Sequence, residues 1–204
     1  MIFLWLIAHR GLVKEKIKEN TLEAFNEALN SPKYVGVELD IRTSKDNEFV
    51  VYHDLLFKGK MVKNTLYKEL KKENVPRLID VLKLKTNKII MIEIKDFDID
   101  VKKMAKLLNS YNNRKLYISS FSNKVLFSLK PLLNNIKIGS LNYVINSLED
   151  YKIFDFICII NYLLTDDLIK YFENNNIEIF GYGIKNIKKL KYQNIYYIVD
   201  DKIT

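Results

Sequence analysis

The sequence contains only two histidines, His9 and His53, and each comes at the end of a short apolar run. Imidazole titrates near neutral pH without special tuning, so two such groups facing one site can act as a general acid and a general base. A lone histidine is more often structural, so this interpretation requires both side chains to reach the same place. The one cysteine, Cys158, lies in an apolar run and is expected to be a small buried hydrophobe. A single cysteine also excludes an internal disulfide and a cysteine-rich zinc site.

Three carboxylates form the second group of candidate residues. Glu38 and Asp40 are separated by one residue in an apolar run, so on a strand both side chains point to the same face. Glu93 lies in a later apolar run that is also predicted to be a strand, with Ile92 and Ile94 facing the other way. Carboxylates gathered without partners repel one another, and a divalent cation relieves that repulsion. All-oxygen ligands favour Mg²⁺ or Ca²⁺ over zinc.

Basic residues near the same strand ends leave a second interpretation open. Arg10, Arg42 and Lys95 could pair with these carboxylates, because structural ion-pair networks also gather charges in clefts. If the carboxylates hold a metal instead, Arg10 and Lys95 are candidates to bind phosphate oxygens. Arg10 could alternatively pair with Glu38 or Glu19.

Alternating apolar runs and amphipathic stretches indicate the elements that must position these residues. Asn20, followed by Glu23, resembles a capping box that opens the first helix, which ends at Ser31-Pro32. The predicted strands are 2–8, 34–41, 88–94, 115–119, 136–140, 154–160, 177–182 and 195–199, with a further extended piece at 48–53. The predicted helices after the first cover 101–108, 124–133, 144–151 (weak), 166–174 and 186–190.

About eight βα units in strict alternation predict an α/β fold with a parallel sheet inside a layer of helices. That number favours a TIM (β/α)8 barrel over a doubly wound open sheet, as a single domain over 1–204 with a vestigial or missing last helix. In such a barrel the active site lies at the carboxyl ends of the strands. His9, the carboxylates and His53 all fall at those ends.

Composition narrows the function classes. The 204 residues carry a net charge of +8, mostly from lysines spread along the chain rather than clustered arginines, which argues against a nucleic-acid binder. The charge is compatible with anionic substrates or peripheral contact with lipid head groups. No apolar run has the length of a membrane span, and the apolar start of the chain, 2–8, is interpreted as a buried strand rather than a signal peptide. The expected location is cytoplasmic.

The motifs taken together resemble the glycerophosphodiester phosphodiesterase family. The resemblance rests on AHRG at 8–11, ENTLEAF at 19–25, VELDI at 37–41, VYHD at 51–54, PRL at 76–78, IEIK at 92–95 and SSFS at 119–122. It is dense over residues 1–95 and diffuse afterwards. It implies a TIM-barrel phosphodiesterase that releases glycerol 3-phosphate and an alcohol from deacylated phospholipids. By position it implies His9 and His53 as the acid/base pair, Glu38, Asp40 and Glu93 as metal ligands, and Arg10 and Lys95 as phosphate contacts.

The sequence also departs from the family pattern. Lys18 stands where a proline usually precedes the ENT motif, Asp80 replaces the usual Glu or Gln, and Tyr182 lies where a tryptophan is often found. The insertion after His53 is shortened, which suggests an open site for a larger or surface-displayed phosphodiester. Two alternatives are a lipid phosphodiesterase like phospholipase D or phosphatidylinositol phospholipase C, and a catalytically weak barrel that binds a phosphorylated ligand. The metal, the alcohol released and the oligomeric state stay open.

Overall fold

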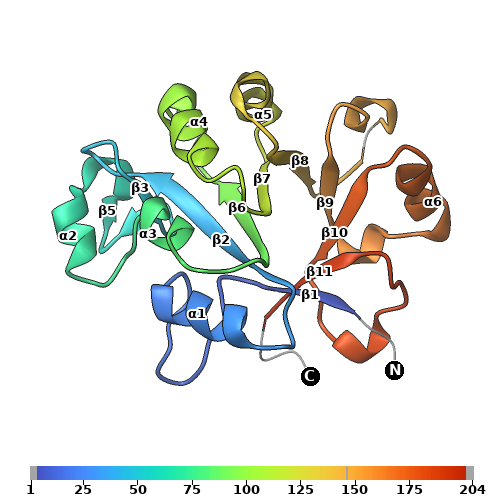
Figure 1. Cartoon of the computed structure of the whole chain (residues 1–204), viewed down its shortest axis with the longest axis horizontal. Helices are drawn as coiled ribbons and strands as arrows, with labels where there is room; N and C mark the ends of the chain where they lie inside the picture. Colours follow the sequence, from blue (N-terminus) through green and yellow to red (C-terminus); the bar gives the residue numbers. More distant parts are fainter. Residues whose placement is uncertain (1–3, 146, 201–204) are drawn as a thin grey trace.

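The computed structural model describes residues 4–145 and 147–200. Within this part of the chain, eight parallel strands form a closed barrel. The barrel closes because β1 pairs with β2 on one side and with β11, from the far end of the chain, on the other (Figure 1). The predicted TIM barrel is therefore confirmed. The barrel strands are β1 (Trp5–Ala8), β2 (Gly36–Thr43), β6 (Ile89–Ile94), β7 (Leu116–Ser120), β8 (Lys137–Asn142), β9 (Phe156–Ile160), β10 (Glu178–Tyr182) and β11 (Tyr196–Val199).

The α-helices of the described residues pack outside this barrel, and several begin at a side-chain cap. Thr21 caps the first helix by accepting a hydrogen bond from the Ala24 amide, and Asp100, Ser122 and Thr165 cap later helices in the same way. Such caps satisfy backbone donors that the first turn leaves free. The helices are α1 (Leu22–Asn30), α2 (Tyr67–Lys71), α3 (Leu78–Leu82), α4 (Val101–Asn109), α5 (Asn123–Leu129) and α6 (Asp166–Asn174).

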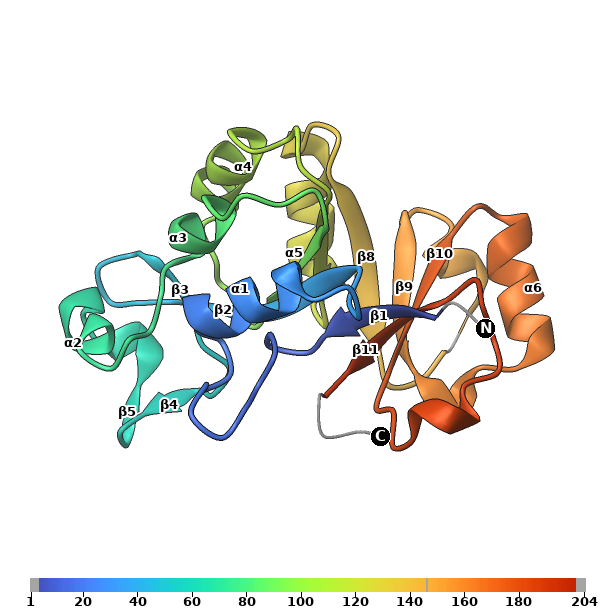
Figure 2. The same cartoon turned by 60° about the horizontal axis from the view of Figure 1, so that its bottom comes forward.

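The segment between β2 and β6 departs from simple βα alternation. The predicted extended piece at 48–53 forms β3 (Phe49–Val51), which pairs antiparallel with β2 and is not a barrel strand. It is followed by a small hairpin, β4 (Leu56–Phe57) and β5 (Lys60–Met61), and by the 3₁₀ turn η1 (Val62–Asn64). Figure 2 shows this segment and α2 extending from one side of the barrel, with α6 on the opposite side. Between 41 and 88 the sequence predicts only the extended piece at 48–53, so the hairpin, η1, α2 and α3 were not expected.

Three predicted helices are shorter than expected. Residues 124–133 form α5 followed by η2 (Lys130–Leu132), and residues 186–190 form only η5 (Ile187–Lys189). In 144–151 the described residues form only η3 (Glu149–Tyr151), and residue 146 lies outside the description. A further 3₁₀ turn that was not predicted, η4 (Asn161–Leu163), follows β9. The predicted start of the first strand at residue 2 and any last helix fall on 1–3 and 201–204, outside the described residues.

Strand alternation divides the core into two layers. Val37, Leu39 and Ile41 of β2 face outward into the main core with helical residues such as Phe25 of α1. Inward-facing residues fill the barrel interior: Ile7, Ile89, Met91, Tyr117, Leu141, Phe156, Cys158, Phe180 and Ile198. The alternation also points Glu38, Asp40 and Glu93 inward, above the apolar filling. No helix among the described residues has the length and apolar character that crossing a membrane requires.

Candidate active site

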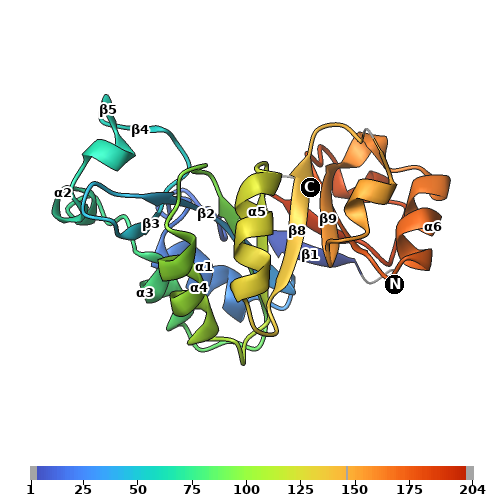
Figure 3. The same cartoon turned by 90° about the horizontal axis from the view of Figure 1, so that it is seen from above.

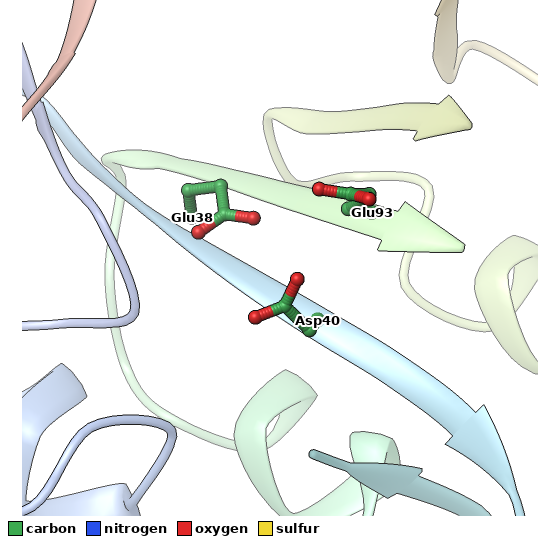
Figure 4. Close-up of side chains that lie close together, drawn as sticks. All are labelled: Glu38, Asp40 and Glu93. Atoms are coloured by element: carbon green, nitrogen blue, oxygen red, sulfur yellow. The ribbon is translucent and has the colours of Figure 1, made fainter. Parts of the chain in front are cut away.

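Three carboxylates converge inside the barrel mouth. Glu38 and Asp40 alternate along β2, and Asp40 lies opposite Glu93 in the register between β2 and β6. One ligand oxygen from each lies within 4.8 Å of the others, and the three side chains turn toward a common space (Figure 4). Glu38 and Asp40 are 3% and 1% exposed. The predicted triad is therefore brought together in a geometry that fits one small cation.

Without a cation, burial and mutual repulsion disfavour the ionised form of carboxyl groups in this triad. Burial, followed by repulsion from Asp40, raises the pKa of Glu38 to about 8. Burial also raises the pKa of Glu93, although the charge of Lys95 opposes the shift. An oxygen of Asp40, Oδ1, is buried and accepts no hydrogen bond in the described structure. Its nearest recorded cation contact is Lys95 Nζ at 3.4 Å. A hard divalent cation matches this all-oxygen donor set.

Arg10 and Lys95 both line the mouth and pair with its carboxylates. Lys95 Nζ lies 2.7 Å from Glu93 Oε1, and Arg10 Nε lies 3.1 Å from Asp40 Oδ2. The ion-pair interpretation thus holds for these two cations, but Arg10 also shares its guanidinium with Glu19 at 2.9 Å. Two cations, one of them shared, do not balance three carboxylates, so the ion pairs do not exclude a metal.

Arg42 does not join this cluster. Its guanidinium pairs with Asp96 at 2.7 Å and donates a hydrogen bond to the His53 carbonyl. Asp96 in turn accepts a hydrogen bond from the Thr43 amide. Arg42 therefore fixes the main chain that carries His53, and of the three cations considered from the sequence it is the one outside the carboxylate triad.

Each histidine is held by a neighbouring aspartate. His9 Nδ1 lies 2.6 Å from Asp200 Oδ1, and His53 Nδ1 lies 2.8 Å from Asp54 Oδ1. Each pairing leaves Nε2 as the ring nitrogen that can exchange a proton with a substrate. Burial lowers the pKa of His9, but the hydrogen bond with Asp200 and the charge of Glu38 outweigh it and raise that pKa above its ordinary value.

The loop after β1 is shaped by two residues in the left-handed region. Arg10 and Gly11 have φ values of 55° and 85°. A Cβ on Gly11 would lie 2.7 Å from the Ala24 backbone carbon, so glycine permits the close approach of α1. The turn also brings the Arg10 amide within 3.2 Å of Glu38 Oε2, to which it donates a hydrogen bond. The loop therefore orders one of the three carboxylates.

The prediction that Asn20 caps the first helix is wrong. Thr21 is the cap, whereas Asn20 adopts a φ of 55° and is buried. Its side-chain amide donates to Asp40 Oδ2 at 3.0 Å. Asn20 tolerates the left-handed conformation better than most residues. The asparagine that a local pattern assigns to a helix end instead supports a carboxylate of the triad.

A cavity of about 190 Å³ lies at the centre of these groups. His9, His53, Glu38 and Glu93 line it together, so the structure brings both histidines and the carboxylates to one place. The floor is apolar, and one wall is aromatic. The aromatic wall consists of Phe121, Tyr143 and Tyr182. The fully buried Cys158 forms part of the floor, and burial raises the pKa of its thiol well above the ordinary value.

The sequence of the chain matches the model of one known protein family. The model of the glycerophosphoryl diester phosphodiesterase family matches residues 9–200. The chain belongs to this family. The match begins at His9 and ends at Asp200, so it contains every candidate residue of the mouth. This membership agrees with the resemblance carried by the sequence motifs.

Individual relatives agree with this family assignment. A glycerophosphodiester phosphodiesterase of Caldanaerobacter subterraneus subsp. tengcongensis is 32% identical over 161 residues, which make up 67% of this chain and 65% of that relative. The chain thus matches slightly less than two thirds of that protein's length. A solved structure from Galdieria sulphuraria superposes with a TM-score of 0.83 at 20% identity, covering 98% of this chain and 94% of that one. An Oleispira antarctica phosphodiesterase, solved with the product sn-glycerol-3-phosphate, gives 0.78 at 19%, covering 97% and 92%. These structural likenesses concern the fold.

Sequence reasoning missed the residues that hold the histidines. Asp200 follows the last predicted strand, so the rule that found His9 and His53 at strand ends would have found it too. Asp54 directly follows His53, and the sequence pattern gave it no role. The stacking of Phe121 and Tyr143 on the cavity wall had no signal in the sequence, because the two residues follow different strands.

Proposed function

We propose that this chain is a metal-dependent phosphodiesterase that hydrolyses glycerophosphodiesters to glycerol 3-phosphate and an alcohol. The observation that carries the proposal is that two aspartate-held histidines line one cavity with Glu38 and Glu93, which converge with Asp40 in a carboxylate triad. Family membership and the relative named a glycerophosphodiester phosphodiesterase support the same activity.

The histidines perform the proton transfers in this proposal. One imidazole takes a proton from the attacking oxygen, which belongs to water or to a hydroxyl of the substrate. The other gives a proton to the alkoxide that leaves phosphorus, so the total number of protons on the pair is unchanged. His9 and His53 are suited to these roles because each presents Nε2 while Nδ1 is engaged.

The charged residues of the mouth bind and orient the phosphodiester. Glu38, Asp40 and Glu93 would hold Mg²⁺ or Ca²⁺, which supplies positive charge opposite the phosphoryl oxygens when bound. Arg10 and Lys95 line the cavity beside the triad, where their cationic groups can bind phosphate oxygens. Asp200 and Asp54 keep the imidazoles oriented.

An activity screen with matched variants tests this function. Purified protein is assayed on glycerophosphocholine with Mg²⁺, with Ca²⁺ and with EDTA, and on sphingomyelin and lysophosphatidylcholine for comparison. We expect activity on the glycerophosphodiester that EDTA abolishes and one of the two metals restores. His9→Ala and His53→Ala should each lower kcat at least about 100-fold, as expected for loss of a general acid or base. Full activity in EDTA would exclude the metal role, and wild-type turnover in either variant would exclude the histidine pair.

A further inference from the structure

Most of the large exposed apolar side chains among the described residues lie around the cavity mouth. Each lies in a loop after the carboxyl end of a strand or in the β4–β5 hairpin, on the side of the barrel where the parallel strands end. Figure 3 shows the β4–β5 hairpin projecting on this same side, beyond the ends of the strands. We call these side chains the rim; they are Leu55 (52% exposed), Leu56 (50%), Phe97 (72%), Phe121 (38%), Tyr143 (61%), Val144 (60%) and Tyr162 (74%).

The rim is continuous with the catalytic cavity. Phe121 and Tyr143 belong to both, since they line the cavity and are also exposed at its edge. Their rings stack with centroids 4.7 Å apart, and Tyr143 meets Tyr182 edge-on at 6.1 Å. An apolar path therefore runs from the cavity wall to the outer surface. The opposite end of the barrel exposes fewer such groups, among them Leu132 and Ile153.

Lysines accompany the rim on the same side of the barrel. Lys58 and Lys60 lie in the β4–β5 hairpin beside Leu56, with side chains 65% and 52% exposed, and pair at the surface with Glu73 and Glu69. Lys16 and Lys18 are exposed in the loop after β1, and Lys185 is exposed in the loop after β10. Apolar side chains mixed with lysines are typical of surfaces that enter the head-group region of an anionic bilayer. Tyrosine suits this boundary because one end of its ring is apolar and the other polar.

We propose that the rim binds the surface of an anionic phospholipid membrane and holds the cavity mouth against it. Moving exposed apolar side chains from water into the boundary between head groups and acyl chains lowers the free energy, and lysines add attraction to anionic head groups. Membrane binding does not depend on hydrolysis, so it stands or falls separately from the proposed activity. The consequence for the reaction is that phosphodiesters carried on amphiphiles reach the cavity along the aromatic wall.

Vesicle flotation tests this binding directly. The protein is mixed with vesicles of equal parts phosphatidylcholine and phosphatidylglycerol, or of phosphatidylcholine alone. The rim variant combines Phe97→Ser with Tyr162→Ser, neither of which lines the cavity. The matched control combines Leu132→Ser with Ile153→Ser, which removes two exposed apolar side chains from the other end of the barrel. Melting temperatures and hydrolysis of soluble glycerophosphocholine are measured for all proteins.

We expect the wild type to float with anionic vesicles, more weakly with neutral ones, and to be released by high salt. The rim variant should lose at least about 10-fold in partition coefficient, since two interfacial side chains are removed. The control should stay within about 2-fold of wild type, as should hydrolysis of the soluble substrate by the rim variant. His53→Ala should float like wild type, which separates binding from catalysis.

Three results would overturn the proposal. The first is a wild type that stays with the soluble fraction under both vesicle compositions. The second is an equal loss of binding in the rim and control variants. The third is a wild type that is dimeric without vesicles while the rim variant is monomeric, because the rim would then be an interface between two copies of the chain.

Discussion

Replacing Glu38 with glutamine is expected to stabilise the metal-free protein at neutral pH while removing its activity. Glu38 is almost fully buried beside Asp40, and its pKa in the folded chain is about 8 against an ordinary value of 4.5. A carboxyl whose pKa is raised on folding binds its proton more tightly in the folded state, so stability falls as pH rises from about 4.5 to about 8. Glutamine has no charge to desolvate. Its side-chain oxygen can still accept the hydrogen bond that the Arg10 amide gives Glu38.

The size of the effect follows from the linkage between pKa and stability. One pKa unit corresponds to about 1.4 kcal/mol, so at pH 7 the buried carboxyl of Glu38 costs about 3 kcal/mol of unfolding free energy. At pH 5, close to the ordinary pKa, the same reasoning gives less than about 1 kcal/mol. A bound divalent cation should remove this penalty in the wild type, because it favours the ionised carboxylate.

Urea denaturation in EDTA at pH 5 and pH 7 measures these differences. Glu38→Gln should be about 3 kcal/mol more stable than wild type at pH 7 and nearly equal at pH 5. Saturating Mg²⁺ or Ca²⁺ should stabilise the wild type and leave the variant almost unchanged. Glu15→Gln, at an exposed loop position, serves as the control and should match wild type at both pH values. A metal-free variant that is no more stable than wild type at pH 7, or equally stabilised at pH 5, would refute the reasoning.

Three further substitutions probe the groups around the triad. Asp200→Asn weakens the hydrogen bond and removes the charge by which Asp200 helps to raise the pKa of His9, so the limb of the pH–rate profile governed by His9 should move to lower pH, whichever role that histidine has. Solvent screens part of this charge because Asp200 is 61% exposed, and an unmoved profile would contradict the pairing. Gly11→Ala should lower the melting temperature and kcat together, because the new Cβ would lie 2.7 Å from the Ala24 backbone and residue 11 has a left-handed conformation. A melting temperature that calorimetry finds unchanged would contradict this packing argument. Tyr182→Ala should raise KM for the phosphodiester more than Tyr182→Phe, which keeps the ring, and steady-state kinetics showing equal effects would exclude the ring as a binding wall.

Much of the candidate site could be predicted because it depends on the alternating direction of side chains along each strand. The spacing of Glu38 and Asp40 places both on one face of a strand wherever that strand lies, and Ile92 and Ile94 force Glu93 inward in the same way. Strand ends in a barrel share one edge, so His9 and His53 were expected at one mouth. In the structure His9, His53, Glu38 and Glu93 line one cavity, and Asp40 lies beside it in the carboxylate triad.

The errors arose where a nearby pattern competed with a distant partner. Asn20 has the residue type and spacing of a helix cap, but its amide is buried against Asp40, and the capping role passes to Thr21. A hydrogen bond to a buried carboxylate outweighs a cap that a neighbouring threonine can provide equally well.

The sequence by itself therefore determined the barrel class, the inward face of each strand that carries a candidate site residue, and the residue types that meet at the mouth. Only the tertiary structure decided that Asp200 orients His9, since the two are 191 positions apart and meet only when β11 closes the barrel against β1. It also decided that exposed apolar side chains from separate loops lie on the side of the barrel where the cavity opens. The physical reason is that periodicity encodes which way a side chain faces, whereas the closure of the sheet determines which distant side chains face each other.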